Sequence, residues 1–242
     1  MNNIPTITKN LIAINVLMFL AHLVAEQQGV DLRAILGLHF YMSADFQPYQ
    51  LVTYMFMHAS FSHLFFNMFA LFIFGGTMER AWGEKRFLLY YLVAGVGAAL
   101  LQETVGLMRY NVIAGSMNPL EVEYVLTHGL EALNQGKNFV VPSLAELNLV
   151  VNLPAVGASG AVYAILLGFG MQFPNERMFV FPIPFPIKAK YFVVGYAVIE
   201  LYLGVSGTAD GVAHFAHLGG MLFGFLLILY WRKKGRINGP YV

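Results

Sequence analysis

A serine and a histidine that could act as nucleophile and base interrupt two of the longest apolar stretches of this chain. Ser159 stands in the run Gly157-Ala158-Ser159-Gly160, and His217 stands in an uncharged stretch nearer the C-terminus. A serine hydroxyl attacks a carbonyl carbon when a neighbouring base takes its proton. Histidine titrates near neutral pH, which suits that base. The pair predicts acyl-transfer chemistry, in which Gly157 and Gly160 leave room for a substrate backbone.

A second group of polar side chains could stabilise the negative charge that such an attack creates on the carbonyl oxygen. His63 and Asn67 carry N–H donors. The backbone N–H of Ser159 is expected at the start of a helix, where free N–H groups and the helix dipole favour an anion. His58 is expected to contact the substrate or to anchor a loop. His214 precedes the candidate base by about one helical turn, and we interpret it as a supporting neighbour.

Each of these residues also has a purely structural interpretation. Ser159 could be a small residue at a contact between helices, where Gly, Ala and Ser are enriched. His217 could be a core histidine with a satisfied hydrogen bond, and Asn67 could be a polar brace between helices. The chemical interpretation is favoured only because the candidates are expected to converge in space.

The composition shows what kind of molecule must position these residues. Hydrophobic residues make up 58% of the 242 residues and charged residues only 11%, whereas a soluble domain carries about 25% charged residues. A soluble enzyme and a disordered chain are therefore excluded. The net charge of +1 argues against a nucleic-acid partner. The absence of cysteine excludes disulfides and thiolate metal sites.

Stretches with no charged residue, or in one case with Glu200 alone, predict an all-α polytopic membrane protein with six transmembrane helices. A helix needs about 20 apolar residues to cross a bilayer, and helices satisfy their backbone groups internally in lipid. We expect a single domain over residues 1–242, with a long outer loop, 106–156, between the third and fourth helices. The predicted helices are 9–26, 60–79, 86–105, 158–174, 190–206 and 212–231.

Lys and Arg predict the orientation of this bundle. With six spans, 11 of the 14 basic residues fall on the side of the termini, and only Arg33, Arg109 and Lys137 fall on the other side. Basic residues mark the cytoplasmic side, so both termini are expected in the cytoplasm. The first helix is expected to be a retained signal-anchor, because Met1–Asn10 lacks a basic leader region and a small-residue cleavage site.

This topology brings the candidate residues to one depth. The second, fourth and sixth helices all run from outside to inside, and His63, Ser159 and His217 lie near their starts. All three are therefore expected in the outer half of the membrane. Within the outer loop, Asn118-Pro119-Leu120-Glu121 is typical of a helix start, and that helix should lie on the membrane surface or over the bundle.

Four motifs in this order resemble those of the rhomboid family of intramembrane serine proteases. The resemblance extends from about Gln50 to Trp231. The motifs are H-x4-H-x3-N at His58, His63 and Asn67; Gly75-Gly76 followed by Glu79-Arg80 and Gly83; G-x-S-G at Gly157–Gly160; and H-x2-G-x3-G at His217, Gly220 and Gly224.

The resemblance implies the role of each matching residue. Ser159 would be the nucleophile and His217 the general base, without cofactor or metal, and Tyr163 would pack on His217. The oxyanion site would come from His63, Asn67 and the Ser159 backbone. The small residues at 220 and 224 would let the sixth helix approach the fourth closely.

The resemblance also implies the setting of the reaction. The substrates would be single-span membrane proteins cut in or near the lipid bilayer. The fifth helix would be a lateral gate, and the loop before the sixth helix a cap. The membrane would be a bacterial plasma (inner) membrane, with the active site opening to its outer side.

Two other functions compete with this one. A histidine-dependent metal membrane protein could use His58, His63, His214 and His217, although the H-E-x-x-H motif and cysteine are absent. A catalytically inactive relative could bind membrane clients, although Ser159 and His217 are both present. Glu200, an acid within the fifth helix, could be a third catalytic member or a gate element. We favour a hydrogen-bonded structural group there, because the family works with a dyad.

Overall fold

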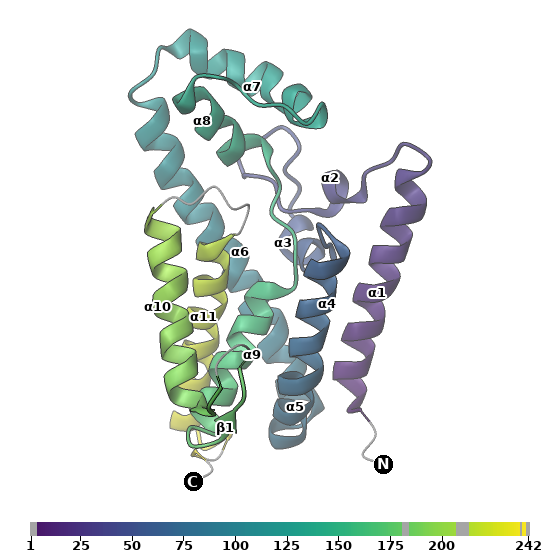
Figure 1. Ribbon diagram of the computed structural model, residues 1–242, viewed down its shortest axis with the longest axis vertical. Coiled ribbons are helices and arrows are strands. Elements are labelled where there is room, and N and C mark those ends of the chain that lie inside the picture. The colour runs from purple at the N-terminus through teal and green to yellow at the C-terminus, as the bar shows by residue number, and fades with distance from the viewer. Residues whose placement is uncertain (1–3, 181–183, 207–212, 238, 241–242) are drawn as a thin grey trace.

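Helices form nearly all of the regular structure in the computed structural model (Figure 1), which describes residues 4–180, 184–206, 213–237 and 239–240. In chain order the elements are α1 (Thr6–Glu26), α2 (Leu32–Leu36), α3 (Gln50–Thr53), η1 (Tyr54–Phe56), α4 (Phe61–Ala70), η2 (Leu71–Gly75), α5 (Gly76–Trp82), α6 (Glu84–Ala114), α7 (Pro119–Asn134), α8 (Pro142–Asn152), α9 (Ser159–Gln172), β1 (Arg177–Met178), β2 (Ile187–Lys188), α10 (Ala189–Ser206) and α11 (His214–Lys233). The two short strands pair antiparallel between α9 and α10.

Five helical segments are long and apolar enough to cross a membrane, within the described residues. They are α1, the continuous run α4–η2–α5, α6, α10 and α11. The sixth apolar helix, α9, has only 14 residues and therefore extends about 21 Å at 1.5 Å per residue. That is less than the roughly 30 Å of a hydrocarbon core. The predicted all-α bundle of a multi-pass integral membrane protein is confirmed.

The largest correction to the predicted helix boundaries is at the end of α6. The predicted helix 86–105 is too short, because α6 continues to Ala114. The predicted helix 158–174 is α9, which ends at Gln172, and the predicted helix 212–231 is described from His214 to Lys233. Residue 212 and the predicted cap, 207–211, lie outside the described residues.

The segment predicted as an outer loop, 106–156, is largely helical. It contains the end of α6 and the helices α7 and α8, which pack against each other beyond the transmembrane bundle (Figure 1). The predicted helix start is confirmed, because the Asn118 side chain accepts from the Leu120 N–H and the Glu121 carboxylate accepts from the Asn118 N–H. Helix α8, which begins at Pro142, was not predicted.

Two buried asparagines of α8 hold it against α7 through hydrogen bonds. Asn148 is fully buried and donates to the carbonyl oxygen of Gly129, at 3.1 Å. Asn152 donates to the side-chain oxygen of Asn148, at 2.9 Å. A side chain at Gly129 would collide with both amides. The pair α7–α8 is therefore joined by buried hydrogen bonds that need a glycine at their centre.

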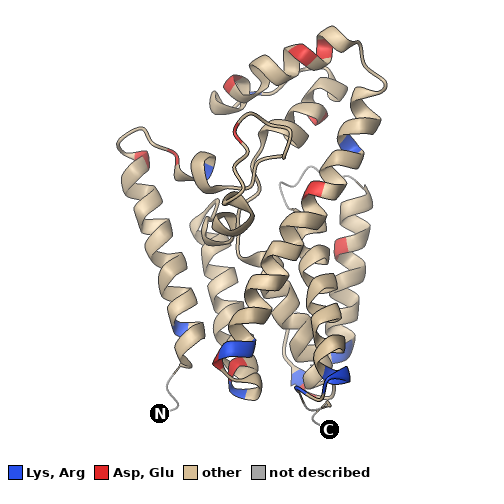
Figure 2. Ribbon diagram, turned by 180° about the vertical axis from the view of Figure 1, so that it is seen from behind, with Lys and Arg blue, Asp and Glu red and all other residues tan. Residues whose placement is uncertain are grey.

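Both chain ends lie at one end of the bundle, and α7 and α8 lie at the other (Figure 1). Lys and Arg gather at the end that carries the termini, whereas most Asp and Glu lie toward the opposite end (Figure 2). The two ends of the bundle therefore differ in charge.

A buried carboxylate holds the start of α1 against α5. Glu79 is 3% exposed, and its carboxylate accepts from the Ile7 N–H at 2.9 Å and from the Thr8 N–H and hydroxyl at 2.7 Å each. The first N–H groups of a helix have no partner within the helix, and α1 has no side-chain cap of its own. Glu79 therefore supplies that cap from another helix.

The core lies where α6, α9 and α11 meet. Gly160 and Gly220 face each other there, and a side chain on Gly220 would overlap the carbonyl group of Gly160. Gly224, one turn later, leaves room for the Tyr90 hydroxyl, which donates to the Ala164 carbonyl oxygen at 2.6 Å. These small residues bring the backbones of α9 and α11 into direct contact.

Candidate active site

Ser159 is the first residue of α9, and backbone hydrogen bonds to two other segments of the chain hold the residues before it in place. Leu38 and Ala155 exchange backbone hydrogen bonds of 2.9 and 2.8 Å, and the Gly157 N–H donates to the Tyr54 carbonyl oxygen at 2.9 Å. Gly157 has a φ of 128°, a conformation that favours glycine. The chain therefore turns sharply into α9 and leaves the Ser159 side chain half-buried at the helix start.

His217 lies on the first turns of α11, directly opposite that serine. Its Nε2 is 2.8 Å from the Ser159 Oγ, which is hydrogen-bond reach. The contact crosses between two helices whose backbones meet through Gly160 and Gly220. A histidine nitrogen at this distance can accept the serine proton.

Tyr163 covers one face of the His217 ring. The two rings are stacked, with centroids 4.0 Å apart and planes 10° from parallel. Tyr163 lies one helical turn after Ser159 on α9, so one helix carries both the serine and the tyrosine. This stack limits rotation of the imidazole ring.

His63 approaches Ser159 from α4. The Ser60 hydroxyl caps α4 by accepting from the His63 N–H at 3.1 Å. The His63 Nδ1 accepts from the Ala59 N–H at 3.4 Å, so the ring proton resides on Nε2. That nitrogen and the Ser159 Oγ both lie close to the position that a side chain on Gly157 would take, so the donor and the serine border the same space.

Asn67 lies one turn after His63 on the same face of α4. Its amide donates to the His63 carbonyl oxygen at 2.9 Å, which leaves a second amide N–H for another acceptor. Both side chains line the cavity that contains Ser159. The two predicted oxyanion donors thus come from one helix face opposite the start of α9.

His58 occupies a different position from the one expected for a substrate contact. It is fully buried, and its ring packs edge-to-face on His63 with centroids 5.0 Å apart. Burial and the neighbouring His63 lower the pKa of His58 to about 3, so it is neutral at physiological pH. The structure brings His58 behind His63, where it supports that ring.

Glu200 of α10 is the residue whose position the sequence reasoning missed. Its Oε2 lies 2.9 Å from the His217 Nδ1 and 2.7 Å from the His214 Nδ1, and its Oε1 accepts from the Tyr163 hydroxyl at 2.6 Å. The only signal in the sequence was a single acid in an apolar helix, which indicates a function by default. Its partners could not be identified from spacing, because they lie on two other helices.

The same cluster has a spacing that could hold a metal ion. The ligand atoms of Glu200, His214 and His217 lie within 4.8 Å of one another. In the structure, however, the two histidine Nδ1 atoms engage the Glu200 carboxylate directly. The four histidines considered from the sequence as metal ligands do not form one group. His58 and His63 lie near each other and outside the cluster that contains His214 and His217.

A cavity of about 1600 Å³ opens above the serine. Ser159, His217, His63 and Asn67 line its floor, and the wall includes Tyr196 of α10 and residues of α8. At its outer edge Arg109 of α6 and Glu146 of α8 form an ion pair of 3.0 Å. The cavity therefore connects the candidate dyad with the α7–α8 pair.

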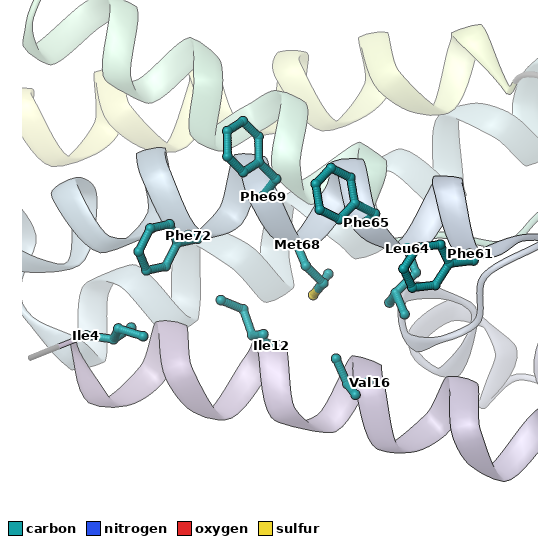
Figure 3. Close-up of a pocket in the computed structure, with 9 residues that line it drawn as sticks. All are labelled: Ile4, Ile12, Val16, Phe61, Leu64, Phe65, Met68, Phe69 and Phe72. Atoms are coloured by element: carbon teal, nitrogen blue, oxygen red, sulfur yellow. The ribbon is translucent and has the colours of Figure 1, made fainter.

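A smaller crevice of about 350 Å³ lies between α1 and α4 (Figure 3). Its lining is entirely apolar and includes Ile12, Val16, Phe65 and Phe72. Because none of its lining side chains can donate a hydrogen bond or transfer a proton, it offers packing surface and no acid–base chemistry.

Comparisons with known proteins agree on one family. Residues 45–234 match the family model described as the Rhomboid domain. Rhomboid protease AarA of Providencia stuartii is 29% identical over 177 residues, which cover 72% of this chain and 52% of that protein.

Two further relatives carry the same family name. Rhomboid protein 1, mitochondrial, of Saccharomyces cerevisiae is 29% identical over 187 residues, 74% of this chain and 40% of that protein. Rhomboid protease GlpG of Haemophilus influenzae is 32% identical over 101 residues, 41% of this chain and 50% of that protein. The chain thus matches about half the length, or less, of each of these relatives.

Proposed function

The chain belongs to the rhomboid family, a family of intramembrane proteases, and on that premise we propose that it is a serine endopeptidase with a Ser159–His217 dyad. The observation that carries the proposal is the 2.8 Å contact between the Ser159 Oγ and the His217 Nε2. The proposed reaction is hydrolysis of a peptide bond of a transmembrane protein, in or near the membrane.

In the first step the Ser159 hydroxyl attacks the scissile carbonyl carbon. The Oγ–C bond forms as His217 Nε2 takes the hydroxyl proton, and the carbonyl electron pair moves onto the oxygen. Collapse of this tetrahedral intermediate breaks the C–N bond. The leaving amine takes the proton from His217, and an acyl-enzyme remains on Ser159.

The oxyanion formed in that step has three proposed donors. They are the Nε2–H of His63, the free amide N–H of Asn67 and the backbone N–H of Ser159 at the start of α9. Donors of this kind are worth more where water is excluded, because the local dielectric is low. The position of His63 against Gly157 supports its part in this set.

In the second step water completes the hydrolysis. His217 takes a proton from the water as its oxygen attacks the acyl carbon, and the proton passes to Ser159 Oγ when the ester bond breaks. No cofactor takes part in this proposal, since a serine, a base and an oxyanion site suffice for acyl transfer.

The setting of the reaction is also proposed. We propose single-span membrane proteins as substrates, because the cavity has an apolar wall between α4 and α10 and a polar outer edge. The gathering of Lys and Arg at the end with both termini (Figure 2) supports a cytoplasmic location for the termini. The site would then open to the outer side of the plasma membrane, which in a bacterium is the inner membrane.

The test is cleavage of a single-span substrate by the purified full chain in proteoliposomes. We expect cleavage by the wild type, none by Ser159→Ala or His217→Ala, and no effect of a metal chelator. A fluorophosphonate probe should label the wild type at Ser159. Cleavage that survives Ser159→Ala, or that a chelator abolishes, would overturn the proposal.

A wild type that binds the substrate without cleaving it, and that the probe does not label, would instead indicate an inactive client-binding relative. The cluster of Glu200, His214 and His217 makes the chelator arm informative, because its spacing suits a metal ion.

A further inference from the structure

Glu200 is an unusual residue for the helix that carries it. Helix α10 presents most of its large side chains outward, and only Ala189, Val193 and Glu200 are buried. Glu200 is 5% exposed. Since a carboxylate within a membrane span is costly unless it is satisfied by partners, its neighbours explain why it is tolerated.

Three hydrogen bonds satisfy the carboxylate from two neighbouring helices. Tyr163 of α9 donates its hydroxyl proton to Oε1 at 2.6 Å. The Nδ1 atoms of His214 and His217, both on α11, lie 2.7 and 2.9 Å from Oε2. An ionised carboxylate accepts all three bonds without conflict, since each partner can donate a proton. A protonated carboxyl would have to donate one of its bonds.

This arrangement fixes the tautomer of His217. When Nδ1 donates its proton to Glu200, the Nε2 atom is unprotonated and can accept the proton of the Ser159 hydroxyl, 2.8 Å away. The opposite tautomer would direct a proton at the serine and leave no base. A carboxylate behind the imidazole also stabilises the imidazolium that forms after proton transfer.

We propose that Glu200 is the third member of a Ser159–His217–Glu200 triad, as a positioning residue that acts through His217. The inference rests on the proposed function, because orientation of His217 matters only if His217 is the base. Glu200 holds the His217 ring and its tautomer, and it keeps the negative charge that balances the imidazolium. It does not itself receive the serine proton.

The triad spans three helices, and its acid is carried by the most outward-facing of them. The serine is on α9, the histidine on α11 and the acid on α10. Displacing α10 from α9 and α11 would withdraw the carboxylate from His217 and break all three hydrogen bonds at once. The proposal therefore makes the reactivity of Ser159 depend on the position of α10.

The test compares Glu200→Gln and Glu200→Asp with the wild type, as full chains in proteoliposomes with a single-span substrate. Gln keeps the size of the side chain but presents an N–H₂ group to its partners. We expect Glu200→Gln to lower kcat by about 10²–10⁴-fold with little change in KM. Fluorophosphonate labelling of Ser159 should slow by a similar factor. Glu200→Asp, which keeps the charge, should recover part of kcat.

The matched control is Glu103→Gln, the same substitution at another acid in a membrane helix. Glu103 lies on α6 and accepts from the Tyr41 backbone N–H at 2.7 Å, so this variant should keep the wild-type kcat. If Glu200→Gln does not fold, Glu200→Asp carries the test, and lower kcat at unchanged KM is expected.

Three results would overturn the triad and can be told apart. If the wild type and Glu200→Gln cleave and label equally while Ser159→Ala is inactive, the dyad stands and the triad is wrong. If the wild type neither cleaves nor is labelled, the proposed function fails, and the triad with it. A fall in kcat that is fully explained by the fraction of unfolded enzyme would also reject a positioning role.

Discussion

The carbonyl group of Gly160 on α9 occupies the space that a side chain on Gly220 of α11 would need. This contact lies one residue after Ser159 and three residues after His217. The distance between nucleophile and base is therefore set by how closely the backbones of α9 and α11 approach each other.

Substitution of Gly220 by alanine should push α11 away from α9. Because a misplacement of about 1 Å can cost roughly 10²-fold in rate, we expect kcat and fluorophosphonate labelling to fall by at least that factor. The variant should also unfold more easily, by about 1–3 kcal/mol of overpacking. The measurements are cleavage rate, labelling rate and thermal unfolding.

The control for this variant is Gly195→Ala on α10, where a side chain would meet no other atom within 4 Å. It should leave stability equal or slightly higher, since alanine favours a helix more than glycine does. Equal activity of Gly220→Ala and wild type would show that the close contact does not position the dyad.

Loss of either proposed oxyanion donor should lower turnover more than binding. For His63→Ala and for Asn67→Ala we expect kcat to fall by about 10²–10³-fold, the cost of one such donor in soluble serine proteases. KM should change little, because the donors act on charge that develops after binding. Phe65→Ala, on the opposite face of α4, is the control. Unchanged kcat in both variants would remove them from the mechanism.

Removal of the Glu79 carboxylate should weaken the fold without touching the chemistry. Glu79→Ala leaves the buried donors of Ile7 and Thr8 without their partner, and we expect a loss of about 2–4 kcal/mol in the free energy of unfolding. At temperatures below its unfolding midpoint, the variant should keep the wild-type kcat. Lys85→Ala, an exposed neighbour, should change stability by no more than about 0.5 kcal/mol. Equal unfolding midpoints for the two variants would contradict the capping role.

Separation of α7 from α8 should affect protein substrates and spare small probes. Gly129→Ala introduces a side chain against Asn148 and Asn152, so we expect faster limited proteolysis between residues 134 and 142. Since α8 borders the cavity through Glu146, KM for the single-span substrate should rise. Fluorophosphonate labelling of Ser159 should not change, because the dyad lies on other helices.

Thr127→Ala, at an exposed position of α7, is the matched control and should behave as wild type. A rise in KM without increased proteolysis would contradict this explanation, since the effect would not come from separation of the two helices.

The transmembrane part of the fold could be predicted because lipid imposes one rule on all of it. Long stretches with no charge, or with Glu200 alone, located the membrane-spanning helices, since charge is costly inside the bilayer. The same rule does not predict helices outside the apolar region. Gln102 and Glu103 indicate where α6 leaves the apolar region, but the helix continues to Ala114 because its backbone bonds do not depend on lipid. Helix α8 was missed because it has no side-chain cap, and only Pro142 indicated its start.

Within the candidate site, the sequence identified the residues but not all of their partners. Ser159, His63 and His217 could be brought to one depth by counting spans, since helix direction alternates. The role of Glu200 could not be found in this way. Its contacts to Tyr163 and His214 depend on how three helices are rotated about their axes, and hydropathy carries no information on rotation for a helix that is apolar on all sides.

The cavity that Ser159 lines also determines how the second reactant, water, arrives. Every hydrolysed peptide bond consumes one water molecule, and in the proposed reaction that water has to reach Ser159 through the cavity, whose lining also includes Ser60, Arg109 and Glu146. Water would then enter along the path that the polypeptide substrate itself occupies. In the proposed reaction the amine product has to vacate that path before water can enter, which ties the turnover rate to product departure.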